Sequence, residues 1–599
     1  MTQFSIIHPA TIDPASPNGR LADSYLARTV FEDEVTRIGT GLLGAKVEEL
    51  LRISGTIRQR FGDATAGGIA VRIPHMNVIA TDYFDQFMGH NRLYGLPFDA
   101  LEDSDIAQAF VDGILPAELM LALYTVVEYH TAPLAVRASR LGPRPFSHGG
   151  CISSHCKMIP NNLGTLEERA LVLGDAVKLI FASSFFRRYR EHLKCVGDAI
   201  EKEKTAVIIQ DVIGERRGDR FYPTMSGTVH SCNFYPQKGS GLYDGSASLV
   251  MGLRKGCISD KDKPWCYALS HPAASVPFNS ARHKLDATQT RFFAIDMTAS
   301  PGRRPTDDCE YIVRGTLADA ELDPAFGLVA STYVAENDRF IPGIGNKGAR
   351  VVDFAPLLAL NAHPLNDTFK AIVETVEDVI FDKVAVDFAM TRDDTTNVLE
   401  LHLLQISPLF MHTMRVGITE ERLSDADIVI CSTRALGNGS LNNVRDIVYL
   451  DPDTFTTAEG SAAAKEVEAI NRRLVADDRP YIFIAMGRIG TSDPFRGLQV
   501  SWHQISGARV FIETDLPNTP QSFSGGNHFF SDLVSCGSFY FYTPGSGERA
   551  LDFCRLSEMI PVESGTYVKH VRSPLPLKVM VDGRTQRGIV VEDRWGALQ

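Results

Sequence analysis

One stretch near the middle of this 599-residue chain, VAVDFAMTRDDTTNVLELHLLQISPL (residues 384–409), constrains the fold more than any other. Its first part alternates apolar side chains with small or polar ones, the apolar positions being Val384, Val386, Phe388 and Met390. A period of two residues predicts a β-strand whose apolar face packs on a core, which leaves Asp387 on the other face. The polar turn RDDTTN and a second apolar run predict an antiparallel partner strand that ends at Gln405, before Ser407-Pro408.

The polar face of this predicted hairpin suits a magnesium ion. Mg²⁺ prefers oxygen ligands and takes few of them from the protein, because water and phosphate supply the rest. The carboxylate of Asp387 and the amide of Gln405 could provide such ligands from opposite strands. An acidic residue on an exposed sheet face would give the same pattern, so the hairpin alone leaves both interpretations open.

The composition narrows the classes of function. The length predicts about two to four domains with substantial cores. A net charge of −13 argues against nucleic acid or an anionic membrane as the main partner. Ten cysteines without a CxxC pair predict reduced thiols and a cytoplasmic protein. We expect no signal peptide and no membrane span, since the most apolar window, residues 119–127, is too short.

A glycine-rich loop precedes a helical pattern near the N-terminus, in RIGTGLLGAK (residues 37–46) followed by VEELLRI. Gly39, Gly41 and Gly44 permit a close backbone approach, and the N-terminus of a helix favours an anion. Lys46 would add a positive charge for a phosphate. The loop lacks the GxxxxGK[ST] pattern of a Walker A motif.

Two further segments carry polar side chains. AVRAS (residues 135–139) includes Arg137, and TAVIIQDV (residues 205–212) has the pattern of a buried strand ending in Gln210 and Asp211. A strand that ends in polar residues is common, so the second segment gains meaning only together with the others.

Between these two segments lie a stretch that contains histidine and cysteine residues and a predicted helix. The possible metal ligands are His148, Cys151, His155 and Cys156. A zinc site is one interpretation, but the spacing matches no common site, and a glycine-rich lid over phosphates is the preferred one. Thr165-Leu-Glu-Glu168 is a capping box that predicts a helix running to about Leu193.

Taken in order, these segments resemble the nucleotide-binding region of the pyruvate phosphate dikinase and phosphoenolpyruvate synthase family, which has the ATP-grasp fold. The loop ending in Gly-Ala-Lys is similar to the family's Leu-Gly-Gly-Lys, and Val-Arg-Ala-Ser is similar to its Val-Arg-Ser-Ser strand. The hairpin is similar to the family's strand pair that ends in Leu-Gln-x-Arg-Pro. The turn Gly252-Leu253-Arg254 stands where the family has Gly-Leu-Gly.

The resemblance implies roles for individual residues. Lys46 and Arg137 would contact the phosphates of ATP, and Gln210 with Asp211 would lie at the adenine. Asp387 and Gln405 would hold Mg²⁺.

The chain also departs from the family at several positions. Ala45 replaces a glycine, Ala385 replaces an acidic residue, and Ser407 replaces the arginine. The family's acidic residue after Arg-Ser-Ser is also absent. These changes reduce the number of side chains that could contact the metal ion and the phosphates.

The resemblance implies a mixed α+β and α/β chain, with a two-lobed ATP-grasp fold and an additional C-terminal α/β domain. The expected divisions are an irregular lead-in (1–30), an N-terminal lobe (31–204), a C-terminal lobe (205–415, with an insertion near 280–350) and the C-terminal domain (416–599).

The C-terminal block has a strand, YIFIAM, that leads into GRIGTSDP (residues 487–494), and a later glycine-rich turn around His528. Both segments are similar to a module that accompanies one branch of the same family. We predict that Arg488 and His528 lie within about 10 Å of each other and line a second polar site. His528 could carry a phosphate, or it could be a hydrogen-bonded structural residue.

The leading hypothesis is an ATP-dependent phosphotransferase of the kinase or dikinase type, with ATP and Mg²⁺ as cofactors. Lys46, Arg137 and His528 would be the catalytic residues, and the acceptor would be a small molecule, a partner protein or His528 itself. The family's phosphohistidine swivelling domain and pyruvate-binding barrel have no counterpart in the sequence. Two alternatives remain: a non-catalytic, nucleotide-binding regulatory protein, and an ATP-grasp ligase that forms an acyl phosphate.

Overall fold

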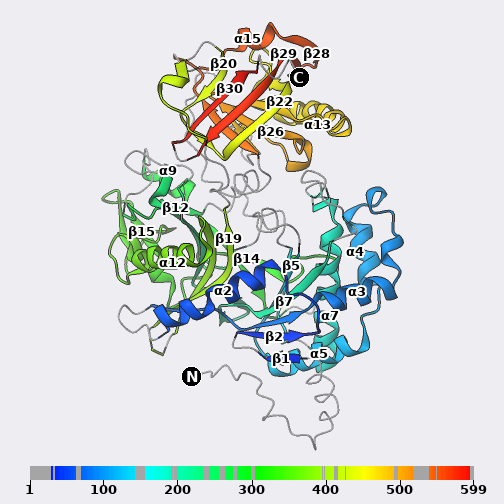
Figure 1. Ribbon diagram of the computed structural model, residues 1–599. Helices are drawn as coiled ribbons and strands as arrows, with labels where there is room; N and C mark the ends of the chain where they lie inside the picture. The colour runs from blue at the N-terminus through cyan, green and yellow to red at the C-terminus, as the bar shows by residue number, and fades with distance from the viewer. Residues whose placement is uncertain are drawn as a thin grey trace, which may run out of the picture.

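The fold of the chain is seen in a computed structural model (Figure 1). The residues that it describes are 29–31, 34–62, 69–141, 155–162, 164–187, 189–190, 193, 200, 203–233, 242–254, 264–273, 280–298, 304–393, 395–396, 398–409, 416–424, 427–490, 497–516, 538–547, 550–583 and 585–593. Helices and several mixed sheets alternate along these residues, which confirms the α+β class.

The first sheet has six strands and is mostly antiparallel, apart from one parallel pair at its β2–β4 junction. In hydrogen-bonding order its strands are β1 (Thr29–Phe31), β2 (Val35–Ile38), β4 (Met76–Ile79), β7 (Thr205–Asp211), β5 (Leu134–Arg140) and β6 (Cys156–Ile159). Its helices are α2 (Ala45–Phe61), α3 (Thr81–His90), α4 (Asp103–Val111), α5 (Ala117–Tyr129) and α7 (Leu166–Ala182).

The second sheet also has six strands, and the hairpin predicted from the sequence lies within it. Its strands, in hydrogen-bonding order, are β12 (Trp265–Ala268), β11 (Ser246–Val250), β10 (Met225–His230), β18 (Val384–Arg392), β19 (Leu399–Pro408) and β3 (Ile69–Arg72). Helices α2 and α12 (Leu365–Ile380) pack against this sheet. Because α2 also contacts β5, it bridges the first two sheets (Figure 1).

The hairpin forms as predicted. Val384, Val386, Phe388 and Met390 are all buried in the core, and Asp387 lies on the opposite face. The second strand continues past the expected end at Gln405 and includes Ser407 and Pro408. A β-bulge interrupts the pairing: Asp387 lies opposite Gln405, but the next residue lies opposite Leu403, so Leu404 is left out of the register.

Two smaller sheets occupy the region expected to be an insertion and its surroundings. One contains β14 (Ile312–Thr316), β13 (Arg291–Asp296), β9 (Arg220–Tyr222) and β8 (Glu215–Arg217), and the other contains β16 (Arg339–Pro342), β15 (Ala330–Val334) and β17 (Ala349–Val352). Short helices accompany them: α9 (Ala281–Ala287), α10 (Phe326–Val329) and α11 (Ala355–Leu358). The segment FGLVASTYV (residues 326–334) is a helical turn, α10, followed directly by strand β15.

A buried ion pair ties this region to the first sheet. Lys157 of β6 lies 2.8 Å from the carboxylate of Glu310, and both side chains are almost fully buried. The same ammonium donates hydrogen bonds to the carbonyl oxygens of Pro305 and Asp307, at 2.9 and 3.0 Å. The loop around Asp307 is therefore held against the edge of the first sheet.

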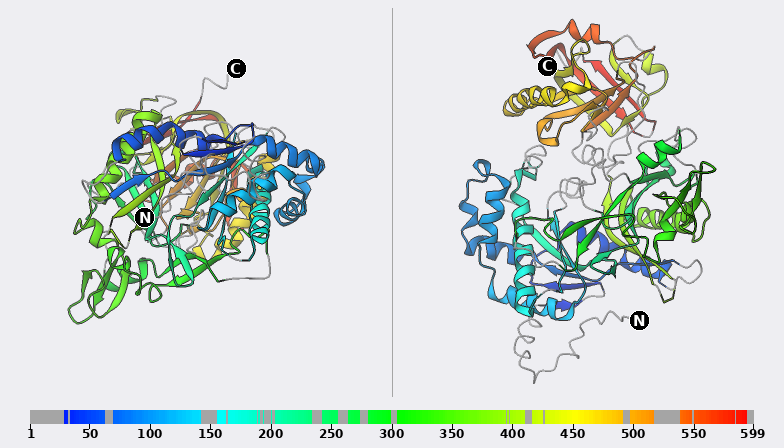
Figure 2. Two further views of the ribbon diagram at one scale, coloured as in Figure 1. Left: turned by 90° about the horizontal axis from the view of Figure 1, so that it is seen from below. Right: turned by 180° about the vertical axis from the view of Figure 1, so that it is seen from behind.

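The C-terminal residues form a nine-stranded sheet, drawn from yellow to red at the top of Figure 1 and of the right-hand view of Figure 2. Its strands in order are β20 (Ile428–Ser432), β30 (Arg587–Glu592), β29 (Val568–Asp582), β22 (Asn438–Leu450), β23 (Tyr481–Met486), β26 (Ala508–Thr514), β27 (Phe539–Thr543) and β21 (Ala435–Leu436), with β28 (Ile560–Ser564) beside β29. The run from β22 to β27 is parallel, and α13 (Gly460–Ala476) packs on it through Val467 and Ile470. A short helix, α15 (Phe553–Ser557), follows β27. Strands β29 and β30 pair antiparallel.

Two expected limits differ from the structure. The capping box at Thr165 is present, but α7 ends at Ala182, where a 3₁₀ turn (Ser183–Phe185) interrupts the helix that we expected to run to about Leu193; the described residues Arg187, Tyr189, Arg190 and Leu193 beyond the turn are again helical. The lobe division expected at residue 204 does not coincide with the sheets, because β7 pairs with β4 and β5 while the early strand β3 joins the second sheet. In the described part of the chain, no helix is both long and apolar enough to cross a membrane.

Candidate functional site

The second sheet has one face that is unusually rich in polar side chains. Strand alternation and pairing place them together, and we call this set the polar face: Ser226, Thr228, His230, Ser246, Ser248, Asp387, His402, Gln405 and Ser407. Most of these side chains are buried, including Thr228, His230 and Gln405. Burying many polar groups on one side of a sheet is costly unless they are hydrogen-bonded or serve a ligand.

Arg137 of β5 links the first sheet to the second. Its Nη2 donates hydrogen bonds to Oε1 of Gln210, at 2.6 Å, and to the carbonyl oxygen of Leu404, at 3.2 Å. Leu404 is the residue left out of the register by the bulge, so its carbonyl group is available to a partner outside the hairpin. Arg137 thus brings a positive charge to the end of the polar face.

Lys46, in the first turn of α2, lies close to Arg137 and is only 4% exposed. Its ammonium makes no hydrogen bond with any residue that the structure describes. Burial, followed by repulsion from Arg137 and Arg140, lowers the pKa of Lys46 from 10.5 to about 7, while Cys156 and Asp387 act in the opposite direction. A buried ammonium without an acceptor is unfavourable, and an anionic ligand would relieve it.

The glycine-rich loop before α2 is arranged differently from the expectation. The amides of Thr40 and Gly41 each donate a 3.0 Å hydrogen bond to the carboxylate of Asp82, and the amide of Leu42 donates to the hydroxyl of Thr81, also at 3.0 Å. These amides are therefore already bonded within the protein. The contribution of this segment to an anion site comes from Lys46.

Gly44 has a clear structural role in this loop. Its φ is +79°, and a Cβ at this position would lie 2.3 Å from the carbonyl oxygen of Ser139 on β5. Only glycine permits both this conformation and this approach. Gly44 therefore brings the start of α2, and Lys46 with it, against the strand that carries Arg137.

Gln210 and Asp211 do not lie together. Being neighbours on β7, they point to opposite faces of the first sheet, and only Gln210 shares a face with Arg137. Nε2 of Gln210 donates to the carbonyl oxygen of Pro74 at 3.0 Å. Asp211 pairs instead with His130 at 2.8 Å.

The predicted metal ligands, Asp387 and Gln405, face each other across the hairpin. The side chain of Asp387 is 41% exposed. Its Oδ1 accepts a hydrogen bond from the hydroxyl of Thr228 and lies 3.4 Å from Nη1 of Arg254. Nε2 of Gln405 donates to the hydroxyl of Ser407 at 3.1 Å.

Sequence reasoning missed His230 and Arg254, which both lie beside Asp387. Burial and the positive charge of Arg254 together lower the pKa of His230 to about 4 against the opposing effect of Asp387, so His230 is neutral near pH 7. The alternation in MSGTVH, which puts Ser226, Thr228 and His230 on one face, could have shown a polar strand beside the hairpin. Nothing local in the sequence marks Arg254.

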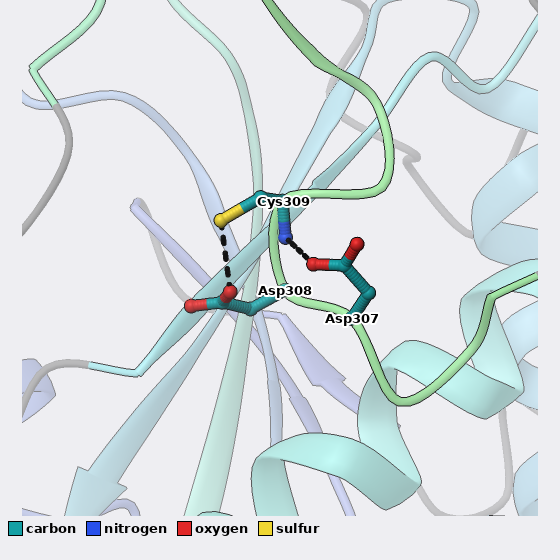
Figure 3. A group of neighbouring side chains, drawn as sticks. All are labelled: Asp307, Asp308 and Cys309. Carbon is teal, nitrogen blue, oxygen red and sulfur yellow. Dashed lines mark hydrogen bonds between the residues drawn. The ribbon is translucent and has the colours of Figure 1, made fainter.

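A second group of potential metal ligands lies outside the polar face. Within the described residues, the only group of three potential ligands within reach of one another is Asp307, Asp308 and Cys309 (Figure 3). Their polar atoms are engaged with each other, since the Cys309 amide donates to Asp307 at 2.8 Å and the Cys309 thiol donates to Asp308 at 3.0 Å.

The proposed zinc ligands lie only partly within the described chain. His148 and Cys151 fall outside it, so the zinc alternative stays a prediction. Of the other two, His155 packs on the ring of Phe186, and Cys156 lies opposite Arg137 in the first sheet. Burial raises the pKa of the Cys156 thiol to about 11, although Arg137 and Lys46 oppose this shift. Cys156 is therefore a neutral neighbour of the cationic pair.

In the C-terminal loop that begins at Gly487, three backbone amides donate hydrogen bonds within the protein. The amide of Gly487 donates to the carbonyl oxygen of Thr514 at 2.8 Å, and the amide of Gly490 donates to that of Leu498 at 3.0 Å. The amide of Ile489 donates to Glu513 at 2.8 Å. The amides of Gly487 and Gly490 are therefore bonded within the protein, and these glycines serve tight turns with φ of +80° and +72°.

The predicted pair of Arg488 and His528 stays a prediction, because His528 lies outside the described residues. Arg488 is buried in the short strand β24 (Arg488–Ile489) beside β25 (Gly497–Leu498). Sequence reasoning missed its neighbour Glu513, which also accepts a hydrogen bond from Tyr540 at 2.8 Å.

The arrangement of Lys46, Arg137 and the polar face can bind an anion at the junction of the first two sheets. The guanidinium of Arg137 is fixed by hydrogen bonds to both sheets, and the ammonium of Lys46 has no acceptor among the described residues. No protein-family model and no curated protein matches the chain. Its function is therefore inferred from its own residues.

Proposed function

We propose that this protein binds ATP at the junction of the first two sheets and transfers a phosphate from it to an acceptor. In this proposal the first two sheets are the two lobes of an ATP-grasp fold, and the enzyme is an ATP-dependent phosphotransferase of the dikinase type. The observation that carries the proposal is the ammonium of Lys46, which is buried beside Arg137 without a hydrogen-bond acceptor among the described residues.

The chemistry of phosphoryl transfer fits such a site. The reaction depends on positioning the phosphates and neutralising their charge more than on a strong base. Lys46 and Arg137 would supply fixed positive charge. Gln210 lies on the same face as Arg137 and would stand near the base of the nucleotide, whereas Asp211 points away from it.

Asp387 and Gln405 are the residues that would hold Mg²⁺. The half-exposed carboxylate and the amide opposite it are oxygen donors of the kind that the ion prefers, and one carboxylate suffices when phosphates supply other ligands. Bound Mg²⁺ would supply further neutralisation of the phosphate charge. His528 stays a proposed phosphate carrier, and the acceptor is otherwise a small molecule or a partner protein.

A non-catalytic, nucleotide-binding role is the second candidate. The observation that favours it is the contact between Asp387 and Arg254, because a carboxylate already paired with a guanidinium is a poorer metal ligand. Both candidates require ATP to bind at the same place. They differ in whether the nucleotide is turned over.

The test uses the full chain. ATP binding is measured by isothermal titration calorimetry, and nucleotide products are identified by ion-exchange chromatography after incubation with Mg²⁺. AMP would support a dikinase reaction, ADP a kinase or ligase, and binding without turnover the regulatory role. The proposal is wrong if wild-type protein binds no ATP.

A matched pair of lysine variants localises the binding. Lys46→Met should weaken ATP binding by about tenfold or more, since a charge-assisted hydrogen bond is lost. Lys178→Met is the control, because Lys178 is also mostly buried but pairs with Asp175 on α7, outside the proposed site. Equal ATP affinity in the two variants would place the nucleotide elsewhere.

A further inference from the structure

Arg254 is held in place by a rigid turn at the end of β11. The side-chain amide of Gln289 accepts from the amide of Met251 and donates to its carbonyl oxygen, both at 2.9 Å. The hydroxyl of Ser226 donates to the carbonyl oxygen of Gly252 at 2.6 Å, and Gly252 has a φ of +80°. The backbone that leads into Arg254 is thus fixed at the polar face.

From this position Arg254 reaches the only carboxylate that strand β18 presents on the polar face. Its Nη1 lies 3.4 Å from Oδ1 of Asp387, and its side chain is 12% exposed. The hydroxyl of Thr228 donates to the same oxygen. Asp387 therefore already has a cationic partner built into the chain.

A divalent metal ion and a guanidinium compete for this carboxylate. Both are cations, and placing them together on one oxygen would add repulsion in a partly buried site, where charges interact more strongly than in water. A metal ion that binds Asp387 must therefore move Arg254 away. A phosphate chain beside Lys46 and Arg137 would offer the displaced guanidinium new acceptors, because arginine binds phosphate oxygens well.

We infer that Arg254 is the resident counter-ion of Asp387, that it keeps divalent metal ions weakly bound until nucleotide arrives, and that it then binds the phosphates. The inference rests on the proposed function for the identity of the nucleotide. Two properties follow. ATP binds measurably without a metal ion, because Arg254 contributes to phosphate binding. The metal ion alone binds weakly, because it must displace Arg254.

The experiment measures metal binding and nucleotide binding separately on the full chain. Mn²⁺ is titrated into nucleotide-free protein and free Mn²⁺ is followed by electron paramagnetic resonance. ATP is titrated calorimetrically in excess EDTA. The proteins are wild type, Arg254→Gln, Arg254→Lys and a control, Arg350→Gln.

The control breaks an ion pair of similar burial. Arg350 lies 2.8 Å from Glu321, with side chains 15% and 44% exposed, on a different sheet from Asp387. Thermal unfolding checks that each variant folds. Arg254→Met, which keeps the aliphatic stem and removes the charge, replaces Arg254→Gln if the latter does not fold.

The neutral variant should bind Mn²⁺ about tenfold more tightly than wild type and bind metal-free ATP about tenfold more weakly. Arg254→Lys, which keeps a cation near Asp387, and Arg350→Gln should stay within about twofold of wild type in Mn²⁺ affinity. Unchanged Mn²⁺ affinity in the neutral variant would overturn the inference. Tighter Mn²⁺ binding in a protein that binds no ATP would support the competition at Asp387 and overturn the proposed function instead.

Discussion

Arg137 donates a hydrogen bond to the carbonyl oxygen of Leu404, the residue that the β-bulge leaves out of the β18–β19 register. The bulge leaves free a carbonyl group that a regular hairpin would have paired, and Arg137 of the first sheet donates its hydrogen bond to that carbonyl oxygen. The same guanidinium holds Gln210. Arg137 is therefore fixed by contacts from both sheets at the place where we propose that the phosphates bind.

Replacing this arginine should separate phosphate binding from base binding. Arg137→Ala should weaken ATP by roughly 1.5–3 kcal/mol, the range for a lost charge-assisted hydrogen bond, and change adenosine affinity little. Calorimetric titration of the variant with both ligands measures the two effects. Equal weakening of ATP and adenosine would mean that Arg137 acts only as a structural link between the sheets.

Asp387→Asn tests the metal assignment while keeping the shape of the side chain. The variant should lose the Mg²⁺-dependent part of ATP binding, because the neutral amide is a much weaker ligand for the ion than a carboxylate. Titrations with ATP in Mg²⁺ and in EDTA give this part by difference. A variant that binds ATP as tightly as wild type in the presence of Mg²⁺ would contradict the assignment of Asp387 as the metal ligand.

Lys46→Met should make the protein more stable. The folded-state pKa of about 7 lies below the ordinary value of 10.5, so between these values the unfolded chain holds more protons than the folded one. The stability of wild type should therefore rise with pH over this range, and the advantage of the variant should shrink. Thermal unfolding of both proteins at about pH 6 and about pH 9 measures the difference. A constant difference between them would show that Lys46 keeps an ordinary pKa.

ATP binding at about pH 8 should be accompanied by uptake of nearly one proton. Lys46 is mostly neutral in the free protein at this pH, and a bound phosphate favours its charged form. Calorimetry in buffers of different ionisation enthalpy counts the protons. The uptake should vanish in Lys46→Met and persist in Lys178→Met. Uptake of the same size in both variants would place the titrating group elsewhere.

Local patterns were enough to predict the hairpin and the face on which Asp387 lies, because strand alternation depends only on neighbouring residues. The same holds for the capping box at Thr165 and for the strand that ends in Gln210 and Asp211. The partners of these residues were beyond such reasoning. Arg254 contacts Asp387 across 133 residues of chain, and nothing near it in the sequence indicates that contact.

Long-range contacts also account for the expectations that failed. Gly39 and Gly41 suggest a loop with free amides, but Asp82, in the first turn of α3, accepts hydrogen bonds from the amides of Thr40 and Gly41. Strand β3 precedes most of the first sheet in sequence, yet it pairs with β19 of the second. Such pairings depend on the packing of whole sheets, which a single sequence without relatives does not reveal.

The ion pair between Lys157 and Glu310 limits how this protein could be shortened or recombined. The region that contains Glu310 was expected to be an insertion, so it is a natural choice for deletion. Deleting this region would leave the Lys157 ammonium buried without its partners, which are Glu310 and the carbonyl oxygens of Pro305 and Asp307. A shortened protein therefore needs an apolar residue in place of Lys157, and a homologue that lacks the insertion should carry an apolar residue there.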